Sequence, residues 1–334
     1  MTDFPSVTSP TNASEASVLA PKPKYVRPRF DFGEIAMHRI CQSAAILVLV
    51  TLVAIIISLI IGAWPAITTF GFGFLISSEW NPPREIFGAL PAIYGTLLTS
   101  VGAMLIAVPI GIMIALFLTE ICPKPFRKPI GIAIELLAGV PSIVYGIWGL
   151  FIFAPFLKTY VQPLIIGSLG QLPLVGSLFS GPPFGIGIFT SALILAIMVL
   201  PFITSISRDV FASVPPVLKE AGYGIGCTTW EVFGKIIFPF SRVGVLGACM
   251  LALGRALGET MAVTFVIGNS HRMPTSLLGP GTTISATIAN EFTEAESDLY
   301  SASLIELALL LFVITFIVLS VARYMLARIE KQKV

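Results

Sequence analysis

The chain has 334 residues, of which 55% are hydrophobic and only 11% carry a charge, and its formal net charge is +2. A soluble globular domain carries about 25% charged residues, so there is too little charge here to cover a soluble surface. The near-neutral balance, without a basic patch interleaved with aromatic residues, gives no sign of nucleic-acid binding. Because the apolar residues come in long blocks separated by short polar gaps, the sequence predicts an integral protein of a lipid membrane.

The first 35 residues are predicted to form a disordered cytoplasmic tail, followed by a transmembrane domain over residues 36–334. The tail is rich in Pro, Ser, Thr and Ala, a composition that buries too little apolar surface to fold. No apolar run begins before about Ala44, whereas a cleavable signal peptide has its short apolar stretch near the start of the chain. We therefore expect no secretory signal.

Six segments are long and apolar enough to cross a bilayer, which takes about 20 residues of helix. The stretch 157–183 is also apolar, but four prolines and four glycines interrupt it, so we expect an external loop there. The predicted spans are approximately 42–63, 92–119, 130–156, 184–206, 243–267 and 302–326.

Basic residues predict the orientation, because Lys and Arg concentrate in cytoplasmic loops. With both termini inside, the internal segments carry sixteen Lys and Arg and the external loops only three, namely Arg84, Lys158 and Arg272. The sequence thus predicts an all-α protein with six transmembrane helices and both termini in the cytoplasm.

The longest predicted internal loop, residues 207–242, contains a spaced motif. It resembles the signature of ABC-importer permeases: Glu-Ala-Ala, three residues, Gly, nine residues, then Ile-x-Leu-Pro. Both spacings match, and two positions depart from it, since Gly222 replaces the second Ala and Phe238 replaces Leu. In the family this loop docks on the ATPase subunit, so the resemblance assigns that role to Glu220, Ala221, Gly222, Gly226, Ile236 and Pro239.

The residues themselves favour a rigid projection at this loop. Pro215 and Pro216 end the preceding helix. Residues 217–223 and about 228–237 can form two short helices, joined at Gly226 by a sharp turn. The chain has no G-x-x-x-x-G-K-[ST] run, so we expect no nucleotide cofactor, no catalytic residues and no enzyme activity in this chain; ATP would bind a separate subunit. The two histidines are isolated, so no metal site is expected.

Arg255 and Glu259 lie inside the predicted fifth span, spaced so that they share a helix face. Inserting a charged residue at the bilayer centre costs roughly 2.5–3.5 kcal/mol on insertion scales. We therefore expect these two side chains to face a protein interior or a water-filled path. Arg stays charged and can bind an oxyanion with two parallel hydrogen bonds. These two residues are therefore the predicted substrate-pathway residues. The alternative is a structural ion pair, and the small residues Gly254 and Gly258 allow the tight helix packing it would need.

Several further stretches resemble the PstC-like permeases of bacterial phosphate (Pst) import. They include Ser78–Pro82, Phe87–Pro91, Tyr94–Leu97, Glu135–Gly146, Gly254–Ala262 and Ala289–Phe292. The resemblance runs from about residue 35 to the C-terminus. It implies a type-I ABC importer permease bundle with its core at about 92–326, in the bacterial inner membrane. It also implies a PstA-like second permease, two ATPase subunits and an external phosphate-binding protein as partners.

Other functions remain open from the residues alone. One is a permease of the same fold for another oxyanion, such as molybdate, sulfate or phosphonate. Others are an ion-driven secondary carrier, which often has inverted repeats, and a channel. No repeat relates 42–156 to 184–326, and no filter-like repeat appears, so the sequence favours the ATP-driven importer.

Overall fold

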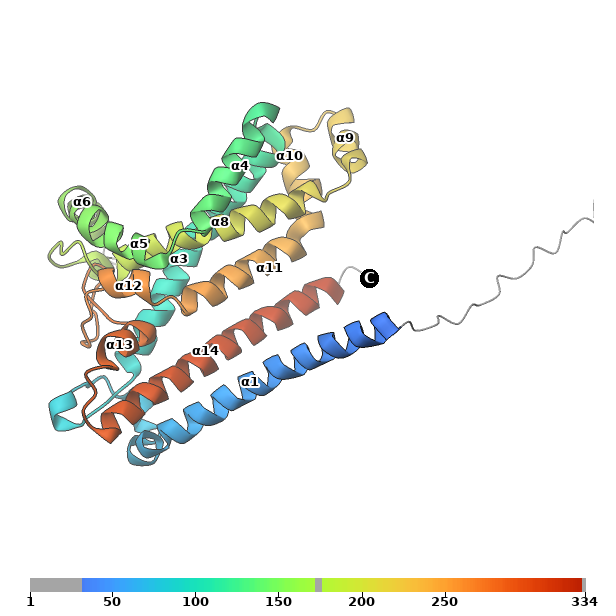
Figure 1. The fold of residues 1–334 in the computed structure, drawn as a ribbon. Coiled ribbons are helices and arrows are strands. Elements are labelled where there is room, and N and C mark those ends of the chain that lie inside the picture. Colours follow the sequence, from blue (N-terminus) through green and yellow to red (C-terminus); the bar gives the residue numbers. More distant parts are fainter. Residues whose placement is uncertain (1–31, 172–175, 332–334) are drawn as a thin grey trace, which may run out of the picture. The chain divides into compact units, whose positions relative to one another are not determined.

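The computed structural model describes residues 32–171 and 176–331 (Figure 1). Most of the predicted tail, residues 1–31, lies outside this described part, and helix α1 already begins at Phe32. The chain divides into two units, one ending at Ala54 and the other beginning at Ile55. The described part of the first unit is the N-terminal half of α1, and every other element belongs to the second.

The described residues form helices and connecting segments, without a named strand. Several helices continue into a π-helical or 3-10 turn, at 117–121, 149–153, 157–161, 169–171 and 233–237, and two further 3-10 turns lie at 82–84 and 176–179. The α-helices are α1 (Phe32–Phe70), α2 (Gly73–Ile76), α3 (Leu90–Leu116), α4 (Lys124–Ala138), α5 (Ser142–Trp148), α6 (Ala154–Phe156), α7 (Gln162–Ser168), α8 (Ile188–Ala212), α9 (Pro216–Gly224), α10 (Thr229–Val232), α11 (Phe238–Leu257), α12 (Met261–Val266), α13 (Ile284–Glu291) and α14 (Asp298–Lys331).

Within the described residues, six helical stretches are long and apolar enough to cross a membrane, as the sequence predicts. They are Ala36–Phe70, Leu90–Ile121, Ser142–Ser168, Ile188–Ala212, Thr229–Leu257 and Asp298–Arg328. An all-α bundle with six membrane-spanning helices is thereby confirmed.

Helix α8 is the centre of the second unit. In its most apolar window 67% of the residues are buried, against 17% for the span in α14. Small residues let α3 approach it closely: a Cβ on Gly111 would lie 2.8 Å from Ile203 Cγ2, and one on Gly102 would lie 3.2 Å from Ala192 Cβ. The largest core cluster is built around α8 and contains Ala103, Ala107, Tyr145, Ile194, Leu195, Ala196, Met198, Val199, Ile203, Ala252, Ala256, Ala262 and Val266.

The predicted third span, 130–156, is wrong in its extent. The chain leaves helical geometry between Ala138 and Ser142, at Gly139–Val140–Pro141. Residues before this break form α4, and the membrane-spanning stretch after it continues to Ser168, through half of the predicted external loop 157–183. Pro163 does not end this stretch, because it falls in the first turn of α7, directly after a π-helical turn, where its missing N–H costs little. Residues 172–175 of the predicted loop lie outside the described part.

The predicted boundaries of the internal loop 207–242 and of the fifth span 243–267 also need correction. Helix α8 continues to Ala212, and the helical stretch that begins at Thr229 runs without interruption into α11. Residues 229–237 therefore form the first part of one long helical stretch that continues into the fifth span, instead of a separate short helix. That span ends at Leu257, and the shorter α12 follows after Gly258–Thr260.

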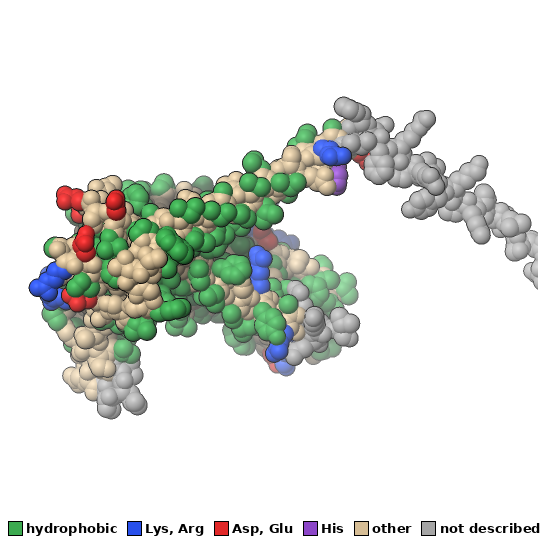
Figure 2. Space-filling view, turned by 90° about the horizontal axis from the view of Figure 1, so that it is seen from below, with side chains coloured by type: hydrophobic (Ala, Val, Ile, Leu, Met, Phe, Trp, Pro, Cys, Tyr) green, Lys and Arg blue, Asp and Glu red, His purple; other side chains and the backbone are tan. Residues whose placement is uncertain are grey.

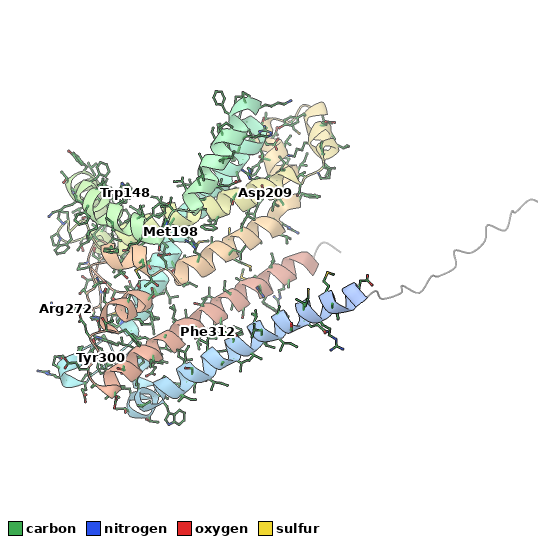
Figure 3. The ribbon with its side chains drawn as sticks, viewed as in Figure 1. Trp148, Met198, Asp209, Arg272, Tyr300 and Phe312 are labelled. Carbon is green, nitrogen blue, oxygen red and sulfur yellow. The ribbon has the colours of Figure 1, made fainter. Side chains whose placement is uncertain are left out.

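The two ends of the second unit differ in their helices and charges. Asp209 lies at the end that carries α4, α9 and α10, and Arg272 and Tyr300 lie at the opposite end (Figure 3). We call these the α9 end and the α13 end. Figure 2 shows hydrophobic side chains over much of the visible face, and acidic side chains gathered at the α13 end. This pattern fits a protein whose middle contacts lipid.

Candidate functional site

Two helix breaks lie side by side in the bundle. One separates α4 from α5 at residues 139–141, and the other separates α11 from α12 at residues 258–260. Helices α5 and α12 pack closely: a Cβ on Gly146 would lie 3.1 Å from both Ala262 Cα and Met261 O. Each break adjoins a membrane-spanning stretch, since the third begins at Ser142 and the fifth ends at Leu257. Non-helical backbone next to such stretches is tolerated where protein buries it or where it lines a water-filled cavity. The paired breaks are therefore the candidate translocation site.

Glu259 belongs to the second break and holds its geometry. Its side chain is almost fully buried, at 9% exposure. One carboxylate oxygen, Oε1, accepts a hydrogen bond from the backbone N–H of Ala262 at 3.2 Å, and the Glu259 carbonyl accepts one from Ser285 Oγ at 2.7 Å. The carboxylate thus caps the first turn of α12 and the backbone joins it to α13, which the sequence does not predict.

Arg255 lies in the last turn of α11 and is exposed. Its guanidinium carbon stands 4.7 Å from the centre of the Phe202 ring, a cation–π contact with α8. Among the described residues it forms no ion pair with Glu259. The prediction that the two share one helix face is wrong, because α11 ends at Leu257 and Glu259 lies beyond it. The guanidinium therefore keeps hydrogen-bond donors free for an anion.

Tyr145 adds a polar group that the sequence did not single out. It lies in the first turn of α5 with 8% of its surface exposed, and its hydroxyl donates to the Leu137 carbonyl at 2.8 Å. This bond spans the first helix break and satisfies one of the last carbonyls of α4. Tyr145 also shares a core cluster with Ala256 and Ala262, and Val140 of the first break packs against that cluster, so the residues around the two breaks belong to one site.

The predicted coupling segment is centred on α9. Gly222 is buried there, and a Cβ on it would lie 2.6 Å from Ile236 Cδ1 and 3.1 Å from Val232 Cγ2. Two members of the motif, one before and one after the turn, thus pack directly on each other. Gly226 has φ +88°, which confirms the predicted turn and the need for glycine.

The remaining motif residues face outward or begin a helix. Glu220 and Ala221 are exposed on α9, and Pro239 lies in the first turn of α11, where its missing N–H is harmless. Large apolar side chains beside them are also exposed, with Ile225 at 83% and Trp230 at 62%. An exposed apolar surface next to a tightly packed turn is typical of a protein-docking site.

Helix α9 is tied to the membrane spans by Lys219. Its ammonium lies 2.7 Å from Glu120 Oε1 at the end of the second span, and it donates to the Phe211 carbonyl at 3.2 Å. The Glu120 side chain is only 9% exposed, so this ion pair is largely screened from water and stronger than a surface pair. This pair therefore joins α9 directly to the end of the second span.

At the α13 end the half-buried carboxylate of Glu291 has three hydrogen-bond partners, which the sequence does not predict. Glu291 Oε2 accepts from Trp80 Nε1 at 2.8 Å and from the Tyr300 hydroxyl at 2.5 Å, and Oε1 lies 2.5 Å from His271 Nε2. The Trp80 and His271 rings stack, with centroids 5.3 Å apart. Burial alone would raise the pKa of the Glu291 carboxyl, but these hydrogen bonds outweigh it and hold that pKa below its ordinary value.

Two further carboxylates, Glu135 and Glu306, fall inside the predicted third and sixth spans. Glu135 lies on α4 and pairs with Arg208 of α8 at 2.6 Å. Glu306 lies two turns into α14, is 6% exposed, and its Oε2 has no hydrogen-bond partner in the described part of the chain. Neither adjoins the paired helix breaks through a contact that the structure records, so neither joins the candidate site.

Comparison with known proteins identifies the class to which this arrangement belongs. Residues 107–331 match the family described as "Binding-protein-dependent transport system inner membrane component". The fold is also that of two solved structures. One is a bacterial alginate ABC transporter in complex with an alginate-bound periplasmic protein, with a TM-score of 0.59, 18% identity, and coverage of 90% of this chain and 98% of that one. The other is a bacterial ABC transporter involved in alginate import, with a TM-score of 0.56, 18% identity, and coverage of 89% and 98%.

The chain therefore belongs to the family of inner membrane components of binding-protein-dependent transport systems. Within it, the chain is 64% identical to the phosphate transport system permease protein PstC of Mesorhizobium japonicum, over 90% of this chain and 92% of that protein. It is 53% identical to PstC of Pasteurella multocida, over 90% and 93%. It is also 37% identical to a probable PstC of Methanocaldococcus jannaschii, over 80% and 85%.

Proposed function

We propose that this chain is the PstC-type permease subunit of an ATP-driven importer and forms part of the path for inorganic phosphate. The observation that supports phosphate as the substrate is the 64% identity with a phosphate permease over 90% of the chain. The fold alone cannot choose a substrate, since the alginate transporters share it at 18% identity. The chain itself is a transport component and not an enzyme.

Phosphate crosses the membrane at the paired helix breaks in this proposal. Arg255 provides the charged donor, because a guanidinium can bind two phosphate oxygens at once and stays ionised at any physiological pH. Its cation–π contact with Phe202 orients it without neutralising it. Glu259 acts as a positioning residue, since its carboxylate caps α12 and thereby fixes the second break.

ATP hydrolysis takes place in a separate subunit, and α9 is the contact to it. The exposed apolar side chains Ile225 and Trp230 fit a groove in such a partner. The packing of Gly222 on Ile236 keeps this surface rigid, and the Lys219–Glu120 ion pair links it to the second span. No nucleotide or other cofactor is assigned to this chain.

The wider assembly follows from the same proposal. It comprises a PstA-like second permease, two ATPase subunits and an external phosphate-binding protein, all at the bacterial inner membrane. The α9 end faces the cytoplasm, where ATP is available, and both termini lie on that side. The α13 end faces outward and receives phosphate from the binding protein.

Competition among oxyanions tests the substrate. Proteoliposomes holding the complete transporter, with the phosphate-binding protein added outside and ATP inside, would take up radioactive phosphate. We expect unlabelled phosphate to suppress this uptake and a hundredfold excess of sulfate, molybdate or phosphonate to leave it nearly unchanged. Stronger suppression by one of the other oxyanions than by phosphate would reassign the substrate while leaving the permease class intact.

A further inference from the structure

A basic cavity lies at the α9 end, away from the paired helix breaks. Its volume is about 500 Å³, within the range of small-molecule sites, and it opens between α4, α8 and α9. Four of its lining side chains are cationic, namely Arg127, Lys128, Arg208 and Lys219, and one, Glu135, is a carboxylate. No residue of the candidate translocation site lines it.

The charges around this basic cavity do not cancel. Arg208 is paired with Glu135 and Asp209, and Lys219 is paired with Glu120. Arg127 and Lys128 have no ion pair among the described residues. Four cations thus face three carboxylates, and the unpaired cations lie in the first two turns of α4.

Arg127 has unused hydrogen-bond donors. Its Nη2 donates to the Cys122 carbonyl at 3.3 Å, whereas its Nε is buried without a partner in the described part of the chain. A guanidinium has five N–H donors and matches the geometry of a phosphate group. An anion in the cavity would bind the outer Nη donors of Arg127, of which only Nη2 has a partner in the described part of the chain.

The charges at the N-terminal end of α4 also favour binding of an anion. The N-terminal turn of a helix carries a partial positive charge and is stabilised by acidic residues. The first five residues of α4 instead include Lys124, Arg127 and Lys128, its first turn has no acidic residue, and Pro123 provides no side-chain cap. The cations therefore lie where the helix dipole opposes them, and a bound anion would offset that repulsion.

The lining of the basic cavity includes the ends of two membrane-spanning helices. Leu118 and Thr119 end the second span, and Arg208 and Ala212 end the fourth. Basic side chains at such span ends meet phosphate groups from lipid or from the cytoplasm.

We propose that this basic cavity binds a phosphate group, carried either by an anionic phospholipid or by inorganic phosphate. The bound group would join Arg127 and Lys128 of α4 to Lys219 of α9, and so would hold the coupling helix α9 against the membrane spans. This inference concerns a second site and does not depend on phosphate being the transported ion.

Thermal unfolding of the full purified chain in lipid nanodiscs tests the proposal in two arms. One compares nanodiscs of phosphatidylcholine alone with nanodiscs that contain phosphatidylglycerol. The other titrates inorganic phosphate at constant ionic strength in phosphatidylcholine nanodiscs. This second arm uses Arg255→Gln protein, so that binding at the proposed transport site cannot contribute. We expect the unfolding midpoint to rise in at least one arm, and the arm identifies the source of the phosphate group.

The double variant Arg127→Gln, Lys128→Gln should weaken that response at least about tenfold in apparent affinity, as expected for the loss of charge-assisted hydrogen bonds. The matched control is Lys124→Gln with Lys235→Gln, which removes the same charge at the α9 end outside the cavity and should respond like the original protein. If the double variant unfolds early without ligand, Lys128→Gln alone repeats the test, because Lys128 is exposed. No midpoint shift in either arm, or an equal loss in the control, would overturn the proposal.

Discussion

The His271 imidazole and the Glu291 carboxylate lie 2.5 Å apart, although 20 residues separate them in the chain. This pair joins the loop after α12 to the end of α13, and Trp80 and Tyr300 add the loop before α3 and the start of α14. One carboxylate therefore holds four segments together at the α13 end. In the proposed orientation this is the surface that meets the binding protein.

The lowered pKa of Glu291 predicts how stability depends on pH. A carboxyl whose folded pKa is depressed contributes stability above its unfolded pKa, and that contribution is lost as the pH falls through the folded value. We expect Glu291→Gln to destabilise the protein at pH 7 by about 2 kcal/mol, since the charge-assisted hydrogen bonds are lost. The difference in unfolding midpoint from the original protein should shrink as the pH falls below about 4.3.

The exposed neighbour Glu294 provides the control for this measurement. Glu294→Gln should unfold like the original protein throughout the pH range. A midpoint difference for Glu291→Gln that stays constant from pH 7 to pH 3 would contradict the assigned role of the Glu291 charge.

Two glycines at the end of α9 allow a matched test of the coupling turn. A Cβ on Gly224 or on Gly226 would meet no atom within 4 Å, but only Gly226 has a positive φ. We expect Gly226→Ala to cost about 1–2 kcal/mol locally, because left-handed backbone disfavours side chains, and to reduce ATP-driven uptake. Gly224→Ala should leave uptake unchanged. Equal uptake by both variants would show that the turn geometry is not needed for coupling.

Substitutions of Arg255 and of Glu259 are expected to reduce phosphate uptake independently, because the structure shows no ion pair between the two residues. Arg255→Gln should abolish phosphate uptake while the protein stays in the membrane, and Arg255→Lys should retain part of it, since the charge remains without the planar guanidinium. Glu259→Gln should lower uptake by loosening the start of α12. Restored uptake in the Arg255→Gln, Glu259→Gln double variant would instead indicate a structural ion pair.

Accessibility of single cysteines tests the proposed orientation. In a variant without the four native cysteines, Glu294→Cys at the α13 end should react with a membrane-impermeant maleimide added to intact cells that have a permeable outer membrane. Lys235→Cys, on a side chain 72% exposed at the α9 end, should react only after the inner membrane is opened. The reverse pattern of reactivity would show that the orientation in the membrane is opposite to the proposed one.

The sequence predicted the features that depend on local residue pattern. Apolar length located six spans, and the Pro215–Pro216 pair and Gly226 located the ends of the coupling helix. The break at Gly139–Val140–Pro141 carried a Gly and Pro signal that could have divided the predicted third span. The break after Leu257 carried a weaker signal, since Gly258 and Thr260 are typical at helix ends but an apolar run continues on both sides of them.

Features that depend on distant contacts could not be predicted in the same way. Glu259 appeared to be half of a helical ion pair, because only the fold shows that its carboxylate caps α12. The Trp80–Glu291 hydrogen bond joins residues 211 positions apart. Such pairs follow from the packing of whole helices, which hydropathy and spacing do not specify.

The energy source for transport tests the central claim most directly. Proteoliposomes that contain this chain with its second permease and ATPase subunits, and the binding protein outside, should accumulate radioactive phosphate when ATP is sealed inside, even with ionophores that abolish every ion gradient. Without internal ATP, an imposed proton or sodium gradient should drive no uptake. Phosphate accumulation driven by a gradient in the absence of ATP, or abolished by ionophores in its presence, would contradict the assignment of this chain as an ATP-driven importer subunit.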